Sequence, residues 1–255
     1  MKNPRITGVF LYFRTMKRLL SLILTLAPFI LNAQRPAKSF NRDSLFHVLL
    51  KDVPEEYRGQ MEKDYNAGDD EEKTFLLIRA SLGFSSKKQL IDNIDSNYSR
   101  INRLKTEYSK LVPGNYVVRI EFNPPNPLLG TAETINLMIL QSIGNGTRPF
   151  QEWNLRYRSD SLDHMLAIVG WKENTLKTIK GLLTDAHCIS IENGEITTIG
   201  YARSGMGLYS YKLFDSNLSE GQIKKYNDGC AYIYYKKNIV LEYGGGAIGS
   251  QCFLD

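Results

Sequence analysis

Few side chains in this sequence have the types and spacing that nucleophilic catalysis requires. His187 lies beside Cys188, and a cysteine next to a histidine suggests a thiol nucleophile with its base. Neighbouring residues face opposite sides of a strand and diverge by about 100° on a helix, which argues against these two side chains serving each other. The sequence therefore predicts a buried cysteine at 188 and a histidine that caps a helix at 187.

A second set of candidates is Asp160 and His164, four residues apart on a predicted helix. On one helix face a carboxylate can orient a histidine as a general base, although Asp160 also suits a helix cap. Ser204 is a candidate nucleophile, but Ala202 stands where the G-x-S-x-G motif has its first glycine. One alternative function is therefore a secreted hydrolase whose site is assembled from distant residues. Its candidate catalytic residues are Asp160, His164, His187 and Ser204.

The sequence contains no recognisable metal or cofactor motif. Its three histidines are widely separated and lack the spacing of zinc ligands. Residues 64–69 begin like a calcium loop, but Asp69 occupies the position where an EF-hand needs glycine. The glycine-rich stretches 203–207 and 244–249 do not precede a predicted helix, as a phosphate-binding loop requires. We therefore expect neither a metal nor a cofactor.

Tyrosines are concentrated in the last part of the chain, where eight of the 15 lie between residues 201 and 243. Tyr234 and Tyr235 are adjacent, so they must face opposite sides of a strand. An exposed tyrosine cluster offers a large contact area with few rotamers to lose. We expect a binding surface that comprises Tyr209, Tyr211, Tyr232, Tyr234 and Tyr235.

The composition and charge are those of a globular protein without a nucleic-acid partner. Hydrophobic residues make up 42% of the chain, charged residues 23%, and the mean hydropathy is −0.30. The net charge is +5, but residues 1–33 hold five cations and no carboxylate, so the remainder carries 27 charges of each sign. A protein that follows a phosphate backbone needs a surplus of cations, which argues against nucleic-acid binding.

The amino terminus has the pattern of a secretory signal peptide. Lys17 and Arg18 precede an apolar run over residues 19–31, and Ala33 provides a small residue at a cleavage site. We assign residues 1–33 to this signal, with its start at Met16. The apolar run is shorter than the roughly 20 residues that span a bilayer, and no later stretch is longer. The mature protein is therefore expected to be secreted or periplasmic, with no membrane span after signal removal.

An oxidising compartment changes the interpretation of the three cysteines. Cys230 and Cys252 bracket a predicted hairpin and a glycine-rich tail, so we expect them to form a disulfide and to leave Cys188 free. The sequence alone leaves the other two pairings open.

The order of predicted elements indicates an α+β fold. Residues 34–112 form a helical region, because apolar residues recur at steps of three and four up to Leu111 before Pro113-Gly114 ends the pattern. Residues 113–255 form a β-rich domain with an antiparallel sheet and inserted short helices. Predicted strands or hairpins span 116–122, 134–140, 152–158, 189–199 (over an Asn193-Gly194 type I′ turn), 208–214 and 231–243; inserted helices span 162–169, 176–183 and 220–226.

These observations favour an exported protein that acts by non-catalytic binding, with another protein as its partner, as in an envelope-associated factor or an inhibitor. Besides the hydrolase, one more alternative stays open, a binder of sugars or peptides that uses the same tyrosines in a groove. The sequence does not determine the oligomeric state.

Overall fold

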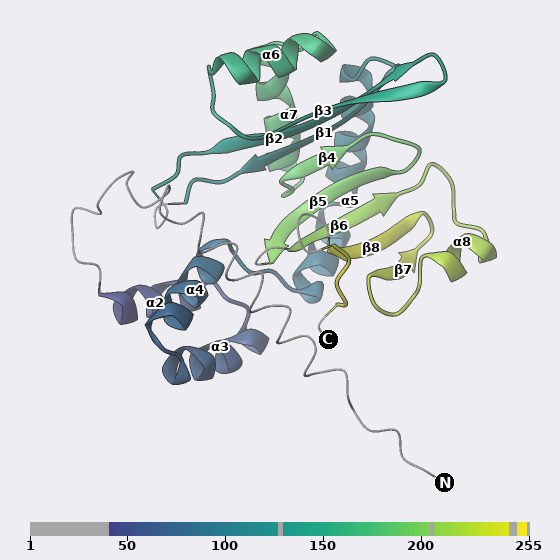
Figure 1. Cartoon of the computed structure of the whole chain (residues 1–255). Coiled ribbons are helices and arrows are strands. Elements are labelled where there is room, and N and C mark those ends of the chain that lie inside the picture. Colours follow the sequence, from purple (N-terminus) through teal and green to yellow (C-terminus); the bar gives the residue numbers. More distant parts are fainter. Residues whose placement is uncertain (1–40, 127–129, 205–206, 245–248, 254–255) are drawn as a thin grey trace. The chain divides into compact units, whose positions relative to one another are not determined.

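The computed structural model describes residues 41–126, 130–204, 207–244 and 249–253 (Figure 1). The predicted signal peptide over residues 1–33 lies outside these ranges, and so does most of the Gly244–Gly249 run. Within the described residues, no helix has the length and apolar character needed to cross a membrane.

Three short helices, α2 (Arg42–Leu50), α3 (Glu55–Ala67) and α4 (Asp70–Ser81), share a small hydrophobic core of their own. Phe46 of α2 stacks on Tyr65 of α3 with their ring centroids 3.8 Å apart. Asp69 starts α4, because its side chain accepts hydrogen bonds from the backbone N–H groups of the first turn in a capping box. We refer to residues 42–84 as the helical lobe.

Helix α5 (Lys87–Leu111) carries the longest apolar stripe of the sequence, as its spacing predicts. Ser86 caps its start, and Ile94, Ile101 and Leu104 along the stripe are completely buried. The helix is kinked at Asn97, whose φ and ψ are −120° and 18°; its amide donates to Oδ1 of Asn93 one turn earlier. These residues belong to the same core as the sheet, so the change of composition at residue 113 does not divide the core.

Eight strands form one antiparallel sheet in the order β3-β2-β1-β4-β5-β6-β8-β7 (Figure 1). This sheet, preceded by helices, confirms the α+β prediction. The strands are β1 (Tyr116–Asn123), β2 (Thr134–Ile143), β3 (Gly146–Leu155), β4 (Ser190–Glu192), β5 (Thr197–Ser204), β6 (Gly207–Leu213), β7 (Tyr232–Lys236) and β8 (Ile239–Gly244).

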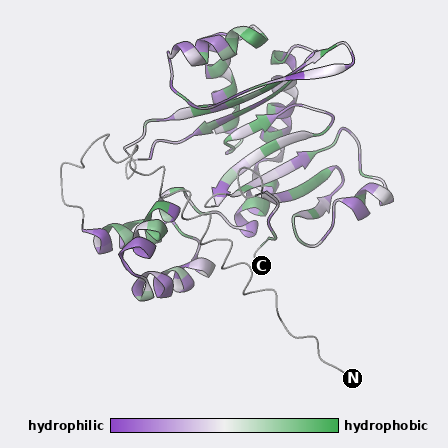
Figure 2. Cartoon of the chain, viewed as in Figure 1, coloured by the Kyte–Doolittle hydropathy of each residue, from purple (hydrophilic) through white to green (hydrophobic). Residues whose placement is uncertain are grey.

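The main hydrophobic core lies between one face of the sheet and helices α5, α6 (Asp160–Val169) and α7 (Glu173–Asp185). Each of these helices buries apolar residues along one side, and Figure 2 shows both hydrophobic and hydrophilic residues on α6. On the opposite side of the sheet, α8 (Glu220–Lys225) packs with Phe214 and Val240 near one end. We call this opposite side the open face.

The predicted two-residue turn at Asn193-Gly194 is wrong in its geometry. Strand β4 ends at Glu192 and β5 starts only at Thr197, and neither turn residue is among the described residues with a positive φ. Asn193 is used differently: its Oδ1 accepts from Val118 N at 2.7 Å and its Nδ2 donates to Tyr116 O at 3.1 Å. The side chain thus continues the pairing of β4 with β1 beyond the end of the strand.

Cys230 and Cys252 lie at disulfide distance, with their sulfur atoms 2.01 Å apart, as the sequence predicts. The link joins the segment before β7 to the C-terminal segment, where Phe253 N also donates to Cys230 O. Cys188 is a buried free cysteine.

Candidate functional site

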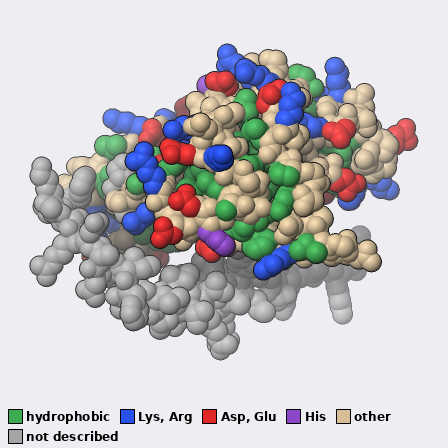
Figure 3. All heavy atoms as spheres, turned by 90° about the horizontal axis from the view of Figure 1, so that it is seen from above, with side chains coloured by type: hydrophobic (Ala, Val, Ile, Leu, Met, Phe, Trp, Pro, Cys, Tyr) green, Lys and Arg blue, Asp and Glu red, His purple; other side chains and the backbone are tan. Residues whose placement is uncertain are grey.

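The open face of the sheet is lined with polar and charged side chains. On β1, Val118 and Ile120 point into the core, so Arg119 and Glu121 point to the open face. The same alternation places Lys212 of β6 and Glu242 of β8 there, and these two form an ion pair of 3.1 Å. Cations and anions are interspersed on the molecular surface as well, as the view from above in Figure 3 shows.

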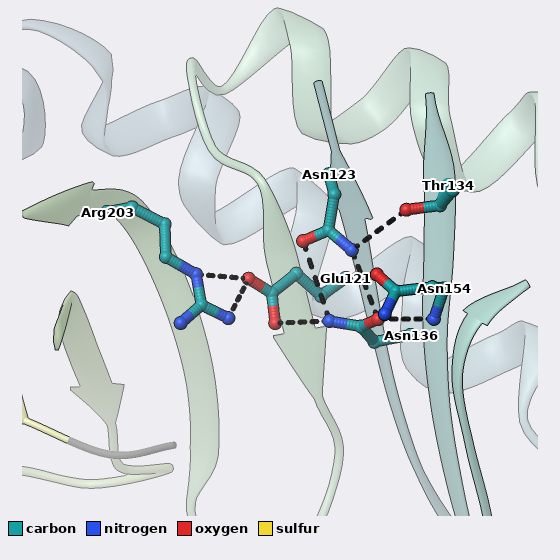
Figure 4. Close-up of polar contacts among 6 residues, drawn as sticks. All are labelled: Glu121, Asn123, Thr134, Asn136, Asn154 and Arg203. Atoms are coloured by element: carbon teal, nitrogen blue, oxygen red, sulfur yellow. Dashed lines mark hydrogen bonds and ion pairs between the residues drawn. The ribbon is translucent and has the colours of Figure 1, made fainter. Parts of the chain in front are cut away.

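A buried ion pair anchors the part of this face near β1, β2 and β5 (Figure 4). Glu121 is only 1% exposed, and its Oε1 accepts from Nε of Arg203 at 2.8 Å and also from Nη2 of the same guanidinium. Its Oε2 accepts from Nδ2 of Asn136 at 3.4 Å. A buried carboxylate needs such compensation, because transfer of its charge out of water is costly.

Asn136 links this ion pair to the edge strand β3. Its Oδ1 accepts from Nδ2 of Asn123 and from the backbone N of Asn154, both at 3.0 Å, while Asn123 also donates to Thr134 (Figure 4). Asn154 has a φ of 57°, a left-handed conformation that asparagine tolerates better than most residues. It lies at a β-bulge, where Trp153 and Asn154 together oppose Asn136. The network therefore fixes the position of Trp153.

A shallow pocket lies beside Trp153 on the open face, and it encloses about 60 Å³. Trp153 is 53% exposed. Within the described residues, neither Trp153 nor Gln151 makes a side-chain hydrogen bond, and the guanidinium of Arg119 makes none either. The pocket is lined by Arg119, Glu121, Asn136, Leu137, Met138, Gln151, Glu152 and Trp153.

This arrangement is suited to binding. Both oxygens of Glu121 already accept hydrogen bonds, so the carboxylate is held as part of the scaffold. Arg119 faces Glu192 across the β1–β4 pair; burial raises the pKa of Glu192, and the nearby cations Arg119 and Lys212 partly oppose that rise. Around the pocket, the indole of Trp153 and the amide of Gln151 are available for an external partner.

The structure does not bring the predicted catalytic residues together. Asp160 and His164 are both exposed on α6, and no hydrogen bond in the described part of the chain joins them. His187 is exposed just after α7 with a φ of 52°. The hydroxyl of Ser204 donates to the backbone oxygen of Ser85 at 3.0 Å, so it is occupied in a structural contact.

Cys188 has the environment of a core residue. It is 7% exposed, and burial raises the pKa of its thiol to about 12. At neutral pH the thiol is therefore protonated, whereas nucleophilic attack requires the thiolate. No group of three or more His, Cys, Asp or Glu side chains in the described ranges is placed to hold a metal ion.

The prediction that Tyr209 and Tyr211 belong to an exposed surface is wrong. Both face the helices and are completely buried. The hydroxyl of Tyr211 donates to Leu90 O at 2.7 Å, which satisfies its polar end inside the core, and Tyr209 stacks on Tyr243 with centroids 4.3 Å apart.

The other three tyrosines of the predicted surface are half-buried and divided between the two sides of β7. Tyr235 points toward α5, where its hydroxyl donates to Oδ2 of Asp95 at 2.6 Å. Tyr232 and Tyr234 pack instead in the cluster beneath α8. The alternation of adjacent tyrosines is thus as expected, but no single face collects all five rings.

Sequence reasoning missed the residues around Trp153. Only the structure shows that Arg119, Asn136 and Trp153, which come from three different strands, share one pocket. The available signal was an isolated tryptophan next to an asparagine, which is a residue that favours irregular strand positions. Comparisons of this chain with protein-family models, with curated proteins and with solved structures find no match.

Proposed function

We propose that this protein is exported and acts without catalysis, by binding another protein through the open face of the sheet around Trp153. The observation that carries the proposal is the exposure of Trp153 beside a pocket whose floor is fixed by the Glu121–Arg203 ion pair. Tryptophan and arginine are the residue types that most often dominate the binding energy of protein interfaces.

The size of the pocket favours a macromolecular surface over a small molecule. Pockets for small ligands commonly enclose about 300–1,000 Å³, whereas this one encloses about 60 Å³. That space accepts a single side chain of a partner, while Trp153, Met138 and Arg119 provide contact area around it. Because the sheet beneath these residues is rigid, less conformational entropy is lost on binding.

Export is supported by two features. The basic, apolar and small-residue segments of residues 16–33 follow the order of a signal peptide. The cysteine pair at disulfide distance is compatible with an extracellular location, because disulfides persist in oxidising compartments. N-terminal sequencing of the exported protein tests this part, with Gln34 as the expected first residue.

The test of binding is affinity capture from the native host with a C-terminally tagged full-length gene, followed by measurement of the affinity for the captured protein. Trp153→Ala should weaken binding by about 30-fold or more, the effect of removing a central interface anchor. Ile143→Ala is the matched control, because Ile143 lies on the same hairpin and is equally exposed, at 52%. Undiminished binding by Trp153→Ala contradicts the proposal.

The same sample addresses the two alternatives. If capture retains no protein and sugars or peptides raise the melting temperature instead, the small-ligand alternative replaces the proposal. A hydrolase would require that alanine at His164 or His187 lowers an activity by about 10²–10⁴.

A further inference from the structure

Exposed hydrophobic side chains gather on the helical lobe. The described residues include eight large hydrophobic side chains that are exposed, and half of them lie on α2, on α4 or at the C-terminal cap of α4. They are Val48 at 57%, Phe75 at 57%, Ile78 at 38% and Leu82 at 39% exposure. Monomeric soluble proteins rarely leave such residues grouped, and a group marks an interaction surface.

Three of these side chains form one stripe along α4 and its C-terminal cap. Phe75, Ile78 and Leu82 are spaced by three and four residues, which places them on one side of a helix. The helix already has another apolar side, where Leu76 and Leu77 are buried in the core of the lobe. The side chains of Phe75, Ile78 and Leu82 therefore do not contribute to the core of the lobe. We call these three residues the α4 stripe.

The charged residues beside the α4 stripe are complementary to the same residues on a second, antiparallel copy of the helix. Glu71 lies one turn before Phe75 on the same side of the helix, within an acidic first turn, and Arg79 lies in the last turn. We propose that two copies of the protein associate through their α4 stripes, with the helices antiparallel about a two-fold axis. Such an interface uses the same patch on both copies.

The register of this pairing follows from the spacing. If Phe75 of one copy lies opposite Ile78 of the second copy, then Glu71 lies opposite Leu82 of the second copy. Arg79 is three residues from Leu82, about 4.5 Å along the axis, within reach of a long side chain. Antiparallel alignment also brings the positive end of each helix dipole beside the negative end of the other.

Other occupants of the α4 stripe fit less well. Parallel helices would place the acidic turns of both copies together, and an anionic membrane surface would meet the same acidic turn, Asp70 to Glu72. The stripe is short, so the association is weak and reversible, unlike the large interfaces of obligate dimers.

Sedimentation equilibrium of the purified full-length protein tests the pairing, over loading concentrations from about 10 µM to about 1 mM. The weight-average mass should rise from one chain toward two. Ile78→Glu should keep the mass at one chain at every concentration, and Ile143→Glu, equally solvent-facing but on the β2–β3 hairpin, should leave the dimer intact.

A charge exchange makes the test specific for the antiparallel arrangement. Arg79→Glu should weaken dimerisation by about tenfold, because it places an acidic residue near Glu71 of the second copy, and the double variant Glu71→Arg/Arg79→Glu should restore it. A protein that stays monomeric up to the highest concentration overturns the proposal. So does a dimer that tolerates Ile78→Glu or that the charge exchange does not restore. The outcome is independent of the binding function proposed for the open face.

Discussion

Removal of Arg203 from the open face is expected to destabilise the protein strongly. In Arg203→Met, the aliphatic part of the side chain remains, but Glu121 loses both of its charged hydrogen bonds while staying almost fully buried. Among the described residues, only the 3.4 Å contact from Asn136 is left. Breaking a buried pair by removing one partner typically costs about 3–5 kcal/mol. Because Arg203 itself is 25% exposed and water can approach, we expect a loss near the lower end, about 3 kcal/mol.

Urea unfolding followed by tryptophan fluorescence measures this loss, since Trp171 is buried in the main core and reports its unfolding. Glu121→Gln is the informative partner variant. This variant leaves Arg203 near solvent and should lower the free energy of unfolding by less, about 1–2 kcal/mol. The double variant should be no less stable than Arg203→Met alone, because no buried charge remains. A loss below about 1 kcal/mol for Arg203→Met, or strictly additive losses, refutes the role assigned to the ion pair.

Three further predictions concern the cysteines and Tyr232. Replacing Cys230 and Cys252 by serine should lower the free energy of unfolding by about 3 kcal/mol for their separation of 22 residues, measured by urea unfolding; an unchanged midpoint contradicts this. Cys188 should resist maleimide at pH 8 in the folded protein, because burial raises the pKa of its thiol to about 12; rapid labelling seen by mass spectrometry contradicts it. Burial and the neighbouring Glu242 raise the pKa of Tyr232 to about 12. The neutral hydroxyl of Tyr232 therefore contributes fully to the stability of the folded protein below pH 10, and this contribution is lost as the pH rises to about 12. Tyr232→Phe should flatten the fall in melting temperature over that interval, and an equal fall in both proteins opposes the assignment.

The helices could be predicted because their signals are local. The stripe of α5 and the cap at Ser86 both act within a few residues, so spacing alone locates the helix. The sequence pattern places strand β3 too late in the chain, at residues 152–158, whereas the strand spans Gly146–Leu155. It is an edge strand with most of its residues exposed, so it shows no alternation of apolar and polar residues.

The proposed binding surface could not be predicted from the sequence because it depends on sheet order. The tyrosines near the C-terminus are frequent for a local reason, strand propensity, and most of them fill the core or half-buried clusters. The pocket at Trp153 instead requires that β1 lies between β2 and β4, and that Arg203 reaches Glu121 from β5. Register and strand order are set by the packing of the whole sheet, which spacing along the chain does not contain.

Site-specific photocrosslinking shows which side of the sheet contacts a partner protein. A photoreactive amino acid is placed at Gln151, beside Trp153 on the open face, and at Asp163, an exposed position of α6 on the opposite side of the sheet. After irradiation in the native host, binding through the open face should give one dominant crosslinked protein from position 151 and none from position 163. Crosslinks from position 163 alone, or the same products from both positions, would contradict recognition through the open face.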